Sequence, residues 1–294
     1  MSDWIVTNLS KHFGKTKSID DISFEIEENK IYGLIGRNGA GKTTLLKLLA
    51  NQLIPTTGEI RIDGKLLKND DELTQTICLS RDFIKLCNNI KGIKVKRLIE
   101  FASYIYPNWD QAFANEIIKD FNLDTNKKYD KLSRGMQTCV GIVIGLASRA
   151  PMTLFDEPYI GLDPIVRELF YEKLLSDYEE NPRTIIISTH LINELENLFE
   201  HIYILHKGKL ILNTSTEETK LKAQVLEGDK DRIESVLAGK RIINKQIIGR
   251  MATYTVYDSF TDAEKRVVKD IGIDFKPINL QKLFINLSKG GDKI

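Results

Sequence analysis

A glycine-rich loop constrains this chain more than any other feature. Residues 36–44 read GRNGAGKTT, after the short apolar run IYGLI and before the leucine-rich run LLKLLANQL. Between a strand and a helix, such a loop points backbone N–H groups at phosphate oxygens, and the helix dipole favours the same anion. In the pattern G-x-x-x-x-G-K-T, Lys42 reaches the terminal phosphates and the Thr43 hydroxyl can ligate Mg²⁺. The predicted nucleotide-binding residues are Gly36, Arg37, Asn38, Gly39, Ala40, Gly41, Lys42, Thr43 and Thr44.

Composition and charge indicate a soluble globular protein. Hydrophobic residues make up 42% of the 294 residues and charged residues 28%, which is ordinary for that class. With 42 basic and 41 acidic side chains the net charge is +1, which argues against nucleic acid as a main partner. Three cysteines, Cys78, Cys87 and Cys139, lack C-x-x-C spacing and are interpreted as buried thiols in a reducing compartment.

Targeting signals are absent from the sequence, which predicts a cytoplasmic protein. The N-terminal MSDWIVTNLS has neither the basic segment nor the long apolar core of a signal peptide. The longest apolar stretch, near residues 139–148, is too short to cross a bilayer. If the chain acts at a membrane, we expect it to be peripheral on the inner face of the cell membrane, docked onto another protein.

The hydrophobic pattern predicts an α/β protein. Alternation of apolar and polar residues indicates strands, and apolar residues at spacings of three and four indicate helices. Predicted strands cover residues 4–13, 18–29, 183–189 and 202–212, a hairpin covers 55–67, and residues 70–130 are mostly helical, with clear helices at 95–106 and 113–123.

The pattern changes after about residue 220, and it predicts a small second domain over residues 221–294. Strands and helices alternate there in the order β-α-β-β-α-β, which is the ferredoxin-like pattern, followed by a closing helix. The predicted strands are 223–228, 241–249, 252–258 and 273–278, and the predicted helices are 231–239, 262–272 and 279–290.

A pair of carboxylates follows a short apolar run in MTLFDEP, residues 152–158. Asp156, at the end of the predicted buried strand, can hold Mg²⁺, and Glu157 can polarise the attacking water. Phosphoryl transfer needs this division of labour because its catalysis is mostly positioning and charge neutralisation. Alone, the pair could equally cap a turn before Pro158, but beside a P-loop it predicts a catalytic site.

A second anion site is predicted where LSRGMQ, residues 132–137, opens a helix. A serine and a glycine at a helix N-terminus can bind phosphate, although a plain N-cap by Ser133 is the simpler reading in isolation. Two phosphate sites in one chain are explained if two chains pair head to tail. Each γ-phosphate is then held by the P-loop of one chain and the helix start of the other.

At this point the chain resembles the ATP-binding cassette (ABC) ATPases, over residues 4–215. The family signature L-S-G-G-Q corresponds to LSRGM, residues 132–136, and the resemblance assigns Ser133, Arg134, Gly135 and Met136 to the ATP of the partner chain. The resemblance implies a cassette over residues 1–215 with an antiparallel β-subdomain and a helical subdomain at about 80–150. It further implies ATP and Mg²⁺ as cofactors.

The resemblance also assigns roles to three further residues. In GLD, residues 161–163, Asp163 would lie at the seam of the dimer. In STH, residues 188–190, His190 would contact the γ-phosphate and steady Glu157 and the water. Phe13 falls where the family places an aromatic ring on adenine, although an aromatic at a strand end can also be a core residue.

The sequence departs from the family pattern at two places. Arg81 or Asp82 stands where the family has a glutamine that ligates Mg²⁺ and senses the γ-phosphate, and the signature carries Arg134 and Met136 in place of Gly and Gln. Asp82 could still reach Mg²⁺ through water. We therefore expect either an altered metal shell or slow turnover that is coupled to a partner.

Within the family, YPNWD (106–110), DKLSRGM, SRAPMTLFDEP and RTIIISTHLI are similar to cassette subunits of bacterial exporters. The resemblance implies an ATPase that energises a separate transmembrane permease subunit, as a homo- or heterodimer of cassettes. The implied cargo is an amphipathic, antimicrobial or cytolytic peptide, or another envelope-active compound.

The alternatives are a soluble ABC ATPase of translation or repair and a weakly hydrolysing regulator. We expect the permease to dock near residues 80–130, and residues 221–294 to serve regulation or dimer contact. The alternative is that residues 221–294 merely cover an exposed face of the cassette.

Overall fold

The computed structural model describes residues 4–68, 70–80 and 92–290. A mixed sheet of six strands, in the order β10-β9-β3-β8-β7-β6, forms its centre, and all its neighbours run parallel except β9 and β10. The bounds of these strands are β3 Ile31–Ile35, β6 Ile77–Leu79, β7 Met152–Asp156, β8 Thr184–Thr189, β9 His201–His206 and β10 Lys209–Ser215. Because β3, β7 and β8 are buried on both faces, they are the nearly continuous apolar runs seen in the sequence.

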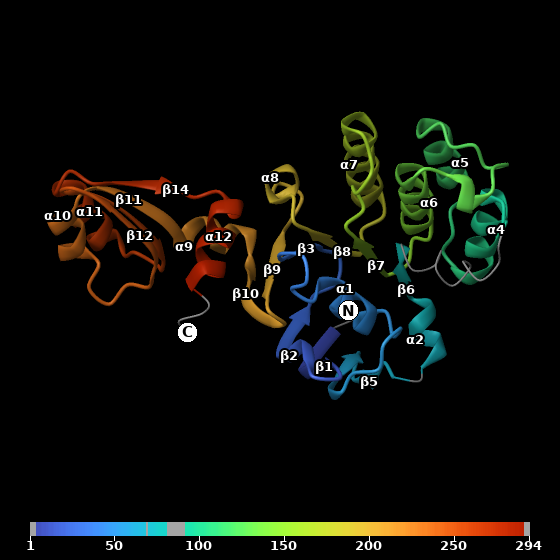
Figure 1. Cartoon of the computed structure of the whole chain (residues 1–294), viewed down its shortest axis with the longest axis horizontal. Helices are drawn as coiled ribbons and strands as arrows, with labels where there is room; N and C mark the ends of the chain where they lie inside the picture. The colour runs from blue at the N-terminus through green and yellow to red at the C-terminus, as the bar shows by residue number, and fades with distance from the viewer. Residues whose placement is uncertain (1–3, 69, 81–91, 291–294) are drawn as a thin grey trace.

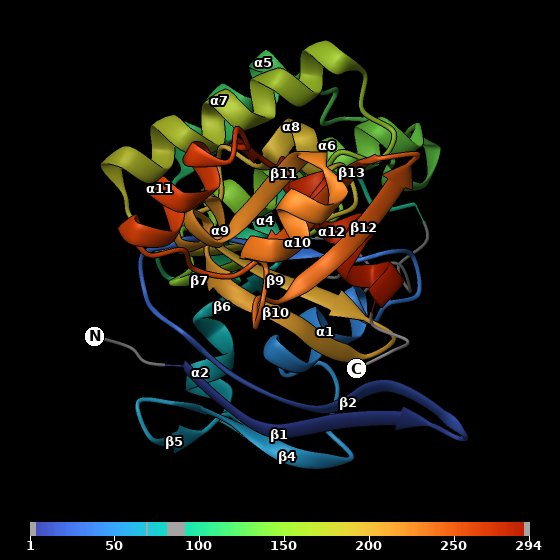
Figure 2. The same cartoon turned by 90° about the vertical axis from the view of Figure 1, so that its left-hand side faces the viewer.

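A second, antiparallel sheet covers one side of the central sheet (Figures 1 and 2). Its order is β2-β1-β4-β5, with β1 Trp4–Phe13, β2 Thr16–Ile26, β4 Thr57–Ile62 and β5 Lys65–Leu66. The predicted hairpin is confirmed, since β4 pairs with β5 across Asp63 and Gly64, both with positive φ. Helix α1, Lys42–Leu49, packs between the two sheets through four buried leucines.

Helices form the far end of the cassette, opposite the C-terminal segment in Figure 1. The helices at this end are α4 Val95–Ile105, α5 Gln111–Asp120, η1 Tyr129–Lys131 and α6 Arg134–Ala147, with α7 Pro164–Glu180 beside them. The other helices before the C-terminal segment are α2 Asp71–Gln75, α8 Ile192–Leu195 and α9 Thr216–Lys222. The helical character predicted for residues 70–130 therefore holds for much of the described part, although β6 interrupts it. Among the described residues, no helix combines the length and apolar character needed to cross a bilayer.

The C-terminal segment carries a sheet and an apolar core of its own. Its elements are β11 Ala223–Asp229, α10 Lys230–Val236, β12 Ile242–Ile248, β13 Met251–Tyr257, α11 Asp262–Asp270 and β14 Asp274–Pro277. The strand order β12-β13-β11-β14, with antiparallel neighbours throughout, is that of a ferredoxin-like fold and confirms the pattern predicted from the sequence. One face of the sheet packs against α10 and α11 through residues such as Tyr254, Ile233 and Val268.

The closing helix α12, Leu280–Gly290, joins this sheet to the cassette (Figure 1). Its buried side chains, among them Leu283 and Phe284, belong to the same apolar cluster as Ile192 and Leu195 of α8. On its other side Asn286 Nδ2 donates a hydrogen bond to Thr255 Oγ1 in β13, at 3.2 Å. The sequence predicted a C-terminal segment that buries its own core. In the structure that segment also shares part of the core of the cassette.

Two of the three cysteines can be compared with expectation. Cys78 and Cys139 are free and buried, as predicted, and burial raises the pKa of both thiols. Cys87 lies outside the described residues.

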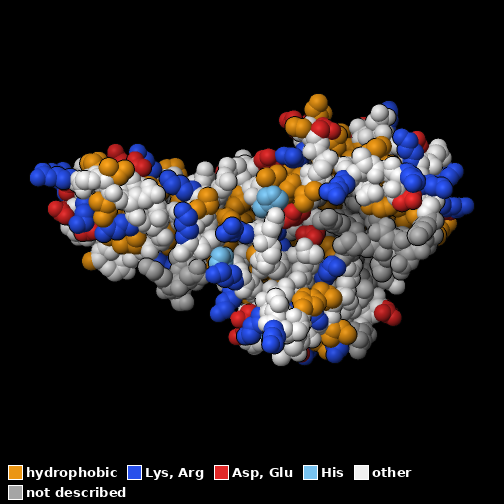
Figure 3. Space-filling view, in the orientation of Figure 1, with side chains coloured by type: hydrophobic (Ala, Val, Ile, Leu, Met, Phe, Trp, Pro, Cys, Tyr) orange, Lys and Arg blue, Asp and Glu red, His pale blue; other side chains and the backbone are white. Residues whose placement is uncertain are grey.

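On the face shown in Figure 3, basic and acidic side chains are interspersed.

Replacing Leu283 tests the packing of α12. Leu283 is fully buried in the cluster shared with α8, so Leu283→Ala should lower the free energy of unfolding by about 2–4 kcal/mol. Ile285 lies on the same helix but is exposed, so Ile285→Ala should cost no more than about 0.5 kcal/mol. Urea denaturation of both variants measures the difference. Equal, small losses would mean that α12 does not hold the two parts together.

Candidate active site

The P-loop lies between β3 and α1, as the sequence predicted. Gly41 is the N-cap of α1 and has φ of 110°, a conformation open to glycine and unfavourable for other residues. A Cβ atom at Gly41 would also lie 2.5 Å from the carbonyl oxygen of Ser18 in β2. The loop is therefore held against the antiparallel sheet, and the first turn of α1 faces the space in front of it.

Lys42 is the buried cation of this loop. Its Nζ donates hydrogen bonds to the carbonyl oxygens of Gly36, at 2.7 Å, and Arg37, at 3.4 Å. The same Nζ lies 3.1 Å from Oε1 of Glu157, and both side chains are largely buried. A buried charge is tolerated only when it is paired and hydrogen-bonded, and Lys42 meets both conditions. The lysine and the carboxylate that the sequence placed in different motifs are therefore in contact.

Asp156 is held by two hydroxyl groups. Thr43 Oγ1 donates to its Oδ2 at 2.8 Å, and Ser188 Oγ donates to its Oδ1 at 2.7 Å. Ser188 Oγ also accepts a hydrogen bond from the backbone N–H of Glu157, at 3.0 Å. Ser188 was not among the site residues predicted from the sequence. Its position could have been found from the pairing of β7 and β8, in which Asp156 and Ser188 lie side by side.

Tyr159 orders the segment around His190. Its hydroxyl accepts hydrogen bonds from the backbone N–H of His190, at 2.9 Å, and from Thr189 Oγ1, at 3.2 Å, and that threonine oxygen accepts from Leu191 N–H. The tyrosine hydroxyl also lies 3.0 Å from His190 Nδ1, so this ring nitrogen is held inside the protein. Burial raises the pKa of Tyr159, which keeps the hydroxyl protonated.

Glu157 lies between the lysine and the histidine. Its Oε1 is 3.4 Å from His190 Nδ1 in addition to its contact with Lys42. The backbone of Glu157 has φ of 49°, an unfavourable conformation for a non-glycine residue that costs on the order of 1 kcal/mol or more. Strain of this kind clusters at functional sites, where the surrounding structure enforces it. Here the hydrogen bond from Glu157 N–H to Ser188 holds the turn.

A cavity of about 310 Å³ lies at the P-loop. It is lined by Ser18, Asn38, Gly39, Gly41, Lys42, Thr43, Thr44, Asp156 and Glu157. Phe13, at the end of β1, is not one of these lining residues. Its side chain is 51% exposed, with Lys11 Nζ 5.3 Å from the ring centroid. The alternative prediction, that Phe13 is a core residue, is therefore wrong.

The signature residues lie at the start of α6, in contact with the loop after β7. Ser133 is the N-cap of α6 and accepts a hydrogen bond from Met136 N–H at 3.3 Å. A Cβ atom on Gly135 would lie 2.3 Å from the carbonyl oxygen of Gly161, so only glycine permits this approach. Asp163 is likewise an N-cap, of α7, and accepts from Val166 N–H at 3.0 Å.

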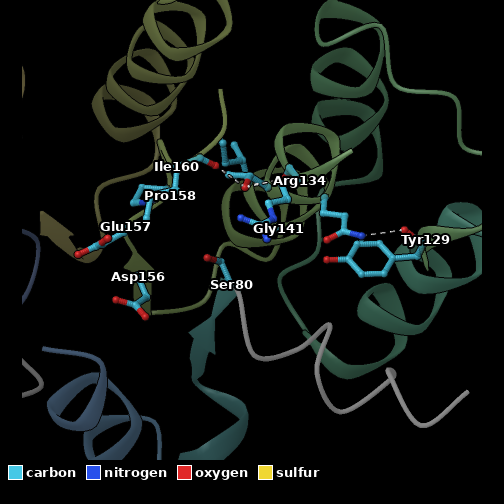
Figure 4. A pocket seen from close by; sticks show the side chains of 11 residues that line it. Ser80, Tyr129, Arg134, Gly141, Asp156, Glu157, Pro158 and Ile160 are labelled. Atoms are coloured by element: carbon cyan, nitrogen blue, oxygen red, sulfur yellow. Dashed lines mark hydrogen bonds between the residues drawn. The ribbon is translucent and has the colours of Figure 1, made fainter. Parts of the chain in front are cut away.

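A second cavity, of about 260 Å³, opens between α6 and the end of β7. Figure 4 shows Asp156, Glu157 and Pro158 on one side of it and Arg134 on the other, with Ser80 at the end of β6. Both cavities are lined by Asp156 and Glu157, whereas Arg134 lines only this second one and Lys42 only the first. The predicted glutamine-replacing positions, Arg81 and Asp82, lie outside the described residues.

The chain matches a known protein family and several known relatives. The family model described as "ABC transporter" matches residues 19–160. The ABC transporter ATP-binding protein YtrB of Bacillus subtilis is 28% identical over 94% of this chain and 95% of its own length. The bacitracin transport ATP-binding protein BcrA of Bacillus licheniformis is 32% identical, over 70% of this chain and 67% of its own length.

Among solved structures, the dimeric post-hydrolysis state of the ATP-binding cassette MJ0796 bound to ADP and phosphate is similar. It is 26% identical with a TM-score of 0.61, over 72% of this chain and 98% of that one. The predicted fold, with a P-loop cassette, is therefore confirmed. The chain belongs to the family of ABC transporter ATP-binding proteins, and it is an ATPase cassette whose hydrolysis of ATP is coupled to transport.

Proposed function

We propose that this ATPase works as one half of a head-to-tail cassette dimer that drives a separate transmembrane subunit. The observation that supports this most strongly is the meeting of Lys42, Asp156 and Glu157 in one cavity at the P-loop. A cation for the phosphates, a carboxylate for the metal and a carboxylate for the water are the groups that phosphoryl transfer requires. In this proposal residues 36–44 bind the phosphates of ATP and Phe13 stacks on adenine.

The residues present fit a Mg²⁺ ion at Thr43 and Asp156. Hydroxyl and carboxylate oxygens are the hard ligands that Mg²⁺ prefers, and these two side chains are already hydrogen-bonded to each other. The remaining oxygen of Asp156 is fixed by Ser188, so the carboxylate has a set orientation. When bound, Mg²⁺ would neutralise charge on the phosphates. Asp82 is a further candidate ligand through water.

Glu157 is the proposed general base. It accepts the proton of the attacking water, and its contact with Lys42 keeps a positive charge beside the carboxylate. His190 would present its Nε2 to the γ-phosphate, because Tyr159 holds the other ring nitrogen. The Tyr159–His190 contact therefore fixes which edge of the imidazole is available.

The second phosphate contact is proposed to come from another cassette. Arg134 is on the far side of the second cavity, which shares Asp156 and Glu157 with the P-loop cavity. In a head-to-tail pair, Ser133, Arg134, Gly135 and Met136 of one chain would meet the ATP held by the other, with Asp163 at the seam. The backbone N–H groups at the start of α6 would then contact the γ-phosphate.

An exposed apolar group on α4 supports docking of a transmembrane subunit. Phe101, Tyr104 and Ile105 are exposed by 42%, 77% and 47%, although they are large apolar or aromatic side chains. Such groups mark protein interfaces when they are contiguous. The proposed occupant is a loop of the transmembrane subunit at the inner face of the membrane. The similarity to BcrA, a bacitracin transport ATP-binding protein, supports export of envelope-active peptides as the transport function.

The C-terminal residues 221–294 are proposed to regulate the cassette at residues 1–215. Leu280 N–H at the start of α12 donates a hydrogen bond to Glu196 Oε2, at 3.1 Å, directly after α8. Helix α8 begins two residues after His190, so a movement of α12 would shift the segment that carries this histidine. Dimer contact is the other role open to this part of the chain.

Substitution of Glu157 separates binding from hydrolysis. Glu157→Gln preserves the shape of the side chain but removes the proton acceptor, so we expect the ATPase rate to fall by about 100-fold or more while ATP still binds. Light scattering should then detect an ATP-dependent dimer. Glu179→Gln, at an exposed position of α7, is the matched control and should leave the rate unchanged. A near-normal rate in Glu157→Gln would assign the base to another residue.

Substitution of Lys42 tests the phosphate site. Lys42→Ala removes a charge-assisted contact worth roughly 1.5–3 kcal/mol, so ATP affinity measured by calorimetry should fall by about 10- to 150-fold. Lys47→Ala, on the same helix but outside the P-loop cavity, should bind ATP as the wild type does. Unchanged affinity in Lys42→Ala would remove the P-loop from the proposed mechanism.

A further inference from the structure

Strand β12 is the open edge of the C-terminal sheet. Its only paired neighbour among the described residues is β13, so its outer side faces away from the sheet. The opposite edge, β14, has four residues, ends in Pro277, and carries Lys276 in an ion pair with Glu227. Short length, proline and charge are the features that protect an edge from pairing. β12 has seven residues, neither proline nor glycine, and one charge at its centre.

The sequence of β12 is the same in both directions by residue class. It reads I-I-N-K-Q-I-I, with Lys245 in the middle and an amide side chain on each side of it. In an antiparallel pair of identical strands, a two-fold axis through one residue places equivalent positions on either side opposite each other. An axis at Lys245 therefore puts Asn244 of one chain opposite Gln246 of the other, and isoleucines towards both ends.

The register of β12 on β13 shows which isoleucines would meet. Lys245 and Ile247 lie opposite Tyr254 and Ala252, on the face of the sheet covered by α10 and α11. The register is irregular between Ile242 and Asn244, so one residue is added there, and Ile242 lies opposite Val256 on that same face.

The added residue, Ile243, packs instead against the cluster that contains α12. When this bulged residue is left out of the pairing, Ile242 of one chain comes opposite Ile247 of the other. The two side chains are exposed by 44% and 46%, so each has apolar surface left for such a contact.

The charges at the centre of the strand are balanced. Two lysines directly opposite each other would destabilise a pair of strands. Lys245 Nζ, however, lies 2.6 Å from Glu234 Oε1 of α10 and 5.1 Å from the centroid of the Tyr254 ring. Each chain thus brings a carboxylate with its lysine, and the two-fold axis would pass through a group of two lysines and two glutamates.

We propose that β12 is a dimerisation edge that pairs antiparallel with β12 of a second copy of this chain, about a two-fold axis at Lys245. The two C-terminal sheets then become one continuous sheet. Isoleucine pairs flank the central charges on the face covered by α10 and α11. This contact needs no nucleotide, so it is separate from the ATP-dependent meeting of the cassettes and does not depend on it.

The test is the oligomeric state of the full chain in the absence of nucleotide. Sedimentation equilibrium of the wild type should give a monomer–dimer equilibrium. Ile247→Lys places a charge against Ile242 of the partner at two symmetric sites, and Ile242→Glu does the same from the other strand. At about tenfold per site, each substitution should raise the dimer Kd by roughly 100-fold. Val267→Lys, at a position of α11 that is 50% exposed and away from β12, is the matched control and should leave the Kd unchanged.

The double variant Ile242→Glu/Ile247→Lys tests the pairing itself. Each new glutamate then lies opposite a new lysine of the partner, so the dimer should re-form although each single variant is impaired. Recovery also shows that the variants are folded. A wild type that remains monomeric up to its solubility limit, or a double variant no better than the singles, overturns the proposal. So does a monomer whose binding to phosphatidylglycerol vesicles is lost in Ile247→Lys, because the edge would then meet a membrane.

Discussion

The contact between Lys42 and Glu157 joins the two motifs on which the active site depends. It connects the first residue of α1 to the turn after β7, across 115 positions of sequence, with Nζ 3.1 Å from Oε1. The same ammonium group also donates a hydrogen bond to a carbonyl oxygen of the P-loop, so the loop itself holds the cation that is proposed to bind phosphate. In the proposed mechanism, phosphate oxygens entering the cavity would compete for that cation with oxygens of the protein. Binding of ATP would then change the surroundings of Glu157 as well as those of Lys42.

Contacts of the turn after β7 connect Glu157 to the other parts of the site. The turn carrying Glu157 is tied to β8 through Ser188, and Tyr159 two residues later is tied to His190. The same turn continues to Gly161, which packs on Gly135 at the start of α6. Beyond His190 the chain enters α8, against which α12 packs. The P-loop and the start of α6 thus contact the turn after β7, and the C-terminal segment contacts the stretch after β8.

Much of this could be predicted from the sequence because the relevant signals are local. The glycine-rich loop, the Asp–Glu pair at a strand end and the ferredoxin-like order of elements each depend on short stretches with a clear period or spacing. Contacts between distant residues were missed. Tyr159 and Ser188 have no spacing that marks them. The role of Ser188 follows from the pairing of β7 with β8, and that of Tyr159 from its hydrogen bonds at His190. The sharing of α12 between two cores was also missed, since amphipathic periodicity shows that a face is buried without showing its partner.

A network of ion pairs connects two of the stretches that were singled out in the sequence, YPNWD (106–110) and SRAPMTLFDEP. Asp110, which ends YPNWD, is the N-cap of α5 and lies 3.0 Å from Arg149, in the turn before β7. Arg149 also pairs with the buried Asp177 of α7, which pairs with Arg183 at the start of β8. Removing one member of a buried network leaves an uncompensated charge, so these residues hold the helical end of the cassette against the strands of the active site.

The central claim is that each ATP site is completed by a second cassette, and mixing two inactive variants tests it most directly. Lys42→Ala disables the P-loop, and Ser133→Arg disables the start of α6, in separate preparations. In a head-to-tail dimer of one chain of each kind, one site has both parts intact and the other has neither. Random pairing then predicts recovery of about a quarter of the wild-type ATPase rate on mixing. A mixture no more active than its two components would contradict the shared site.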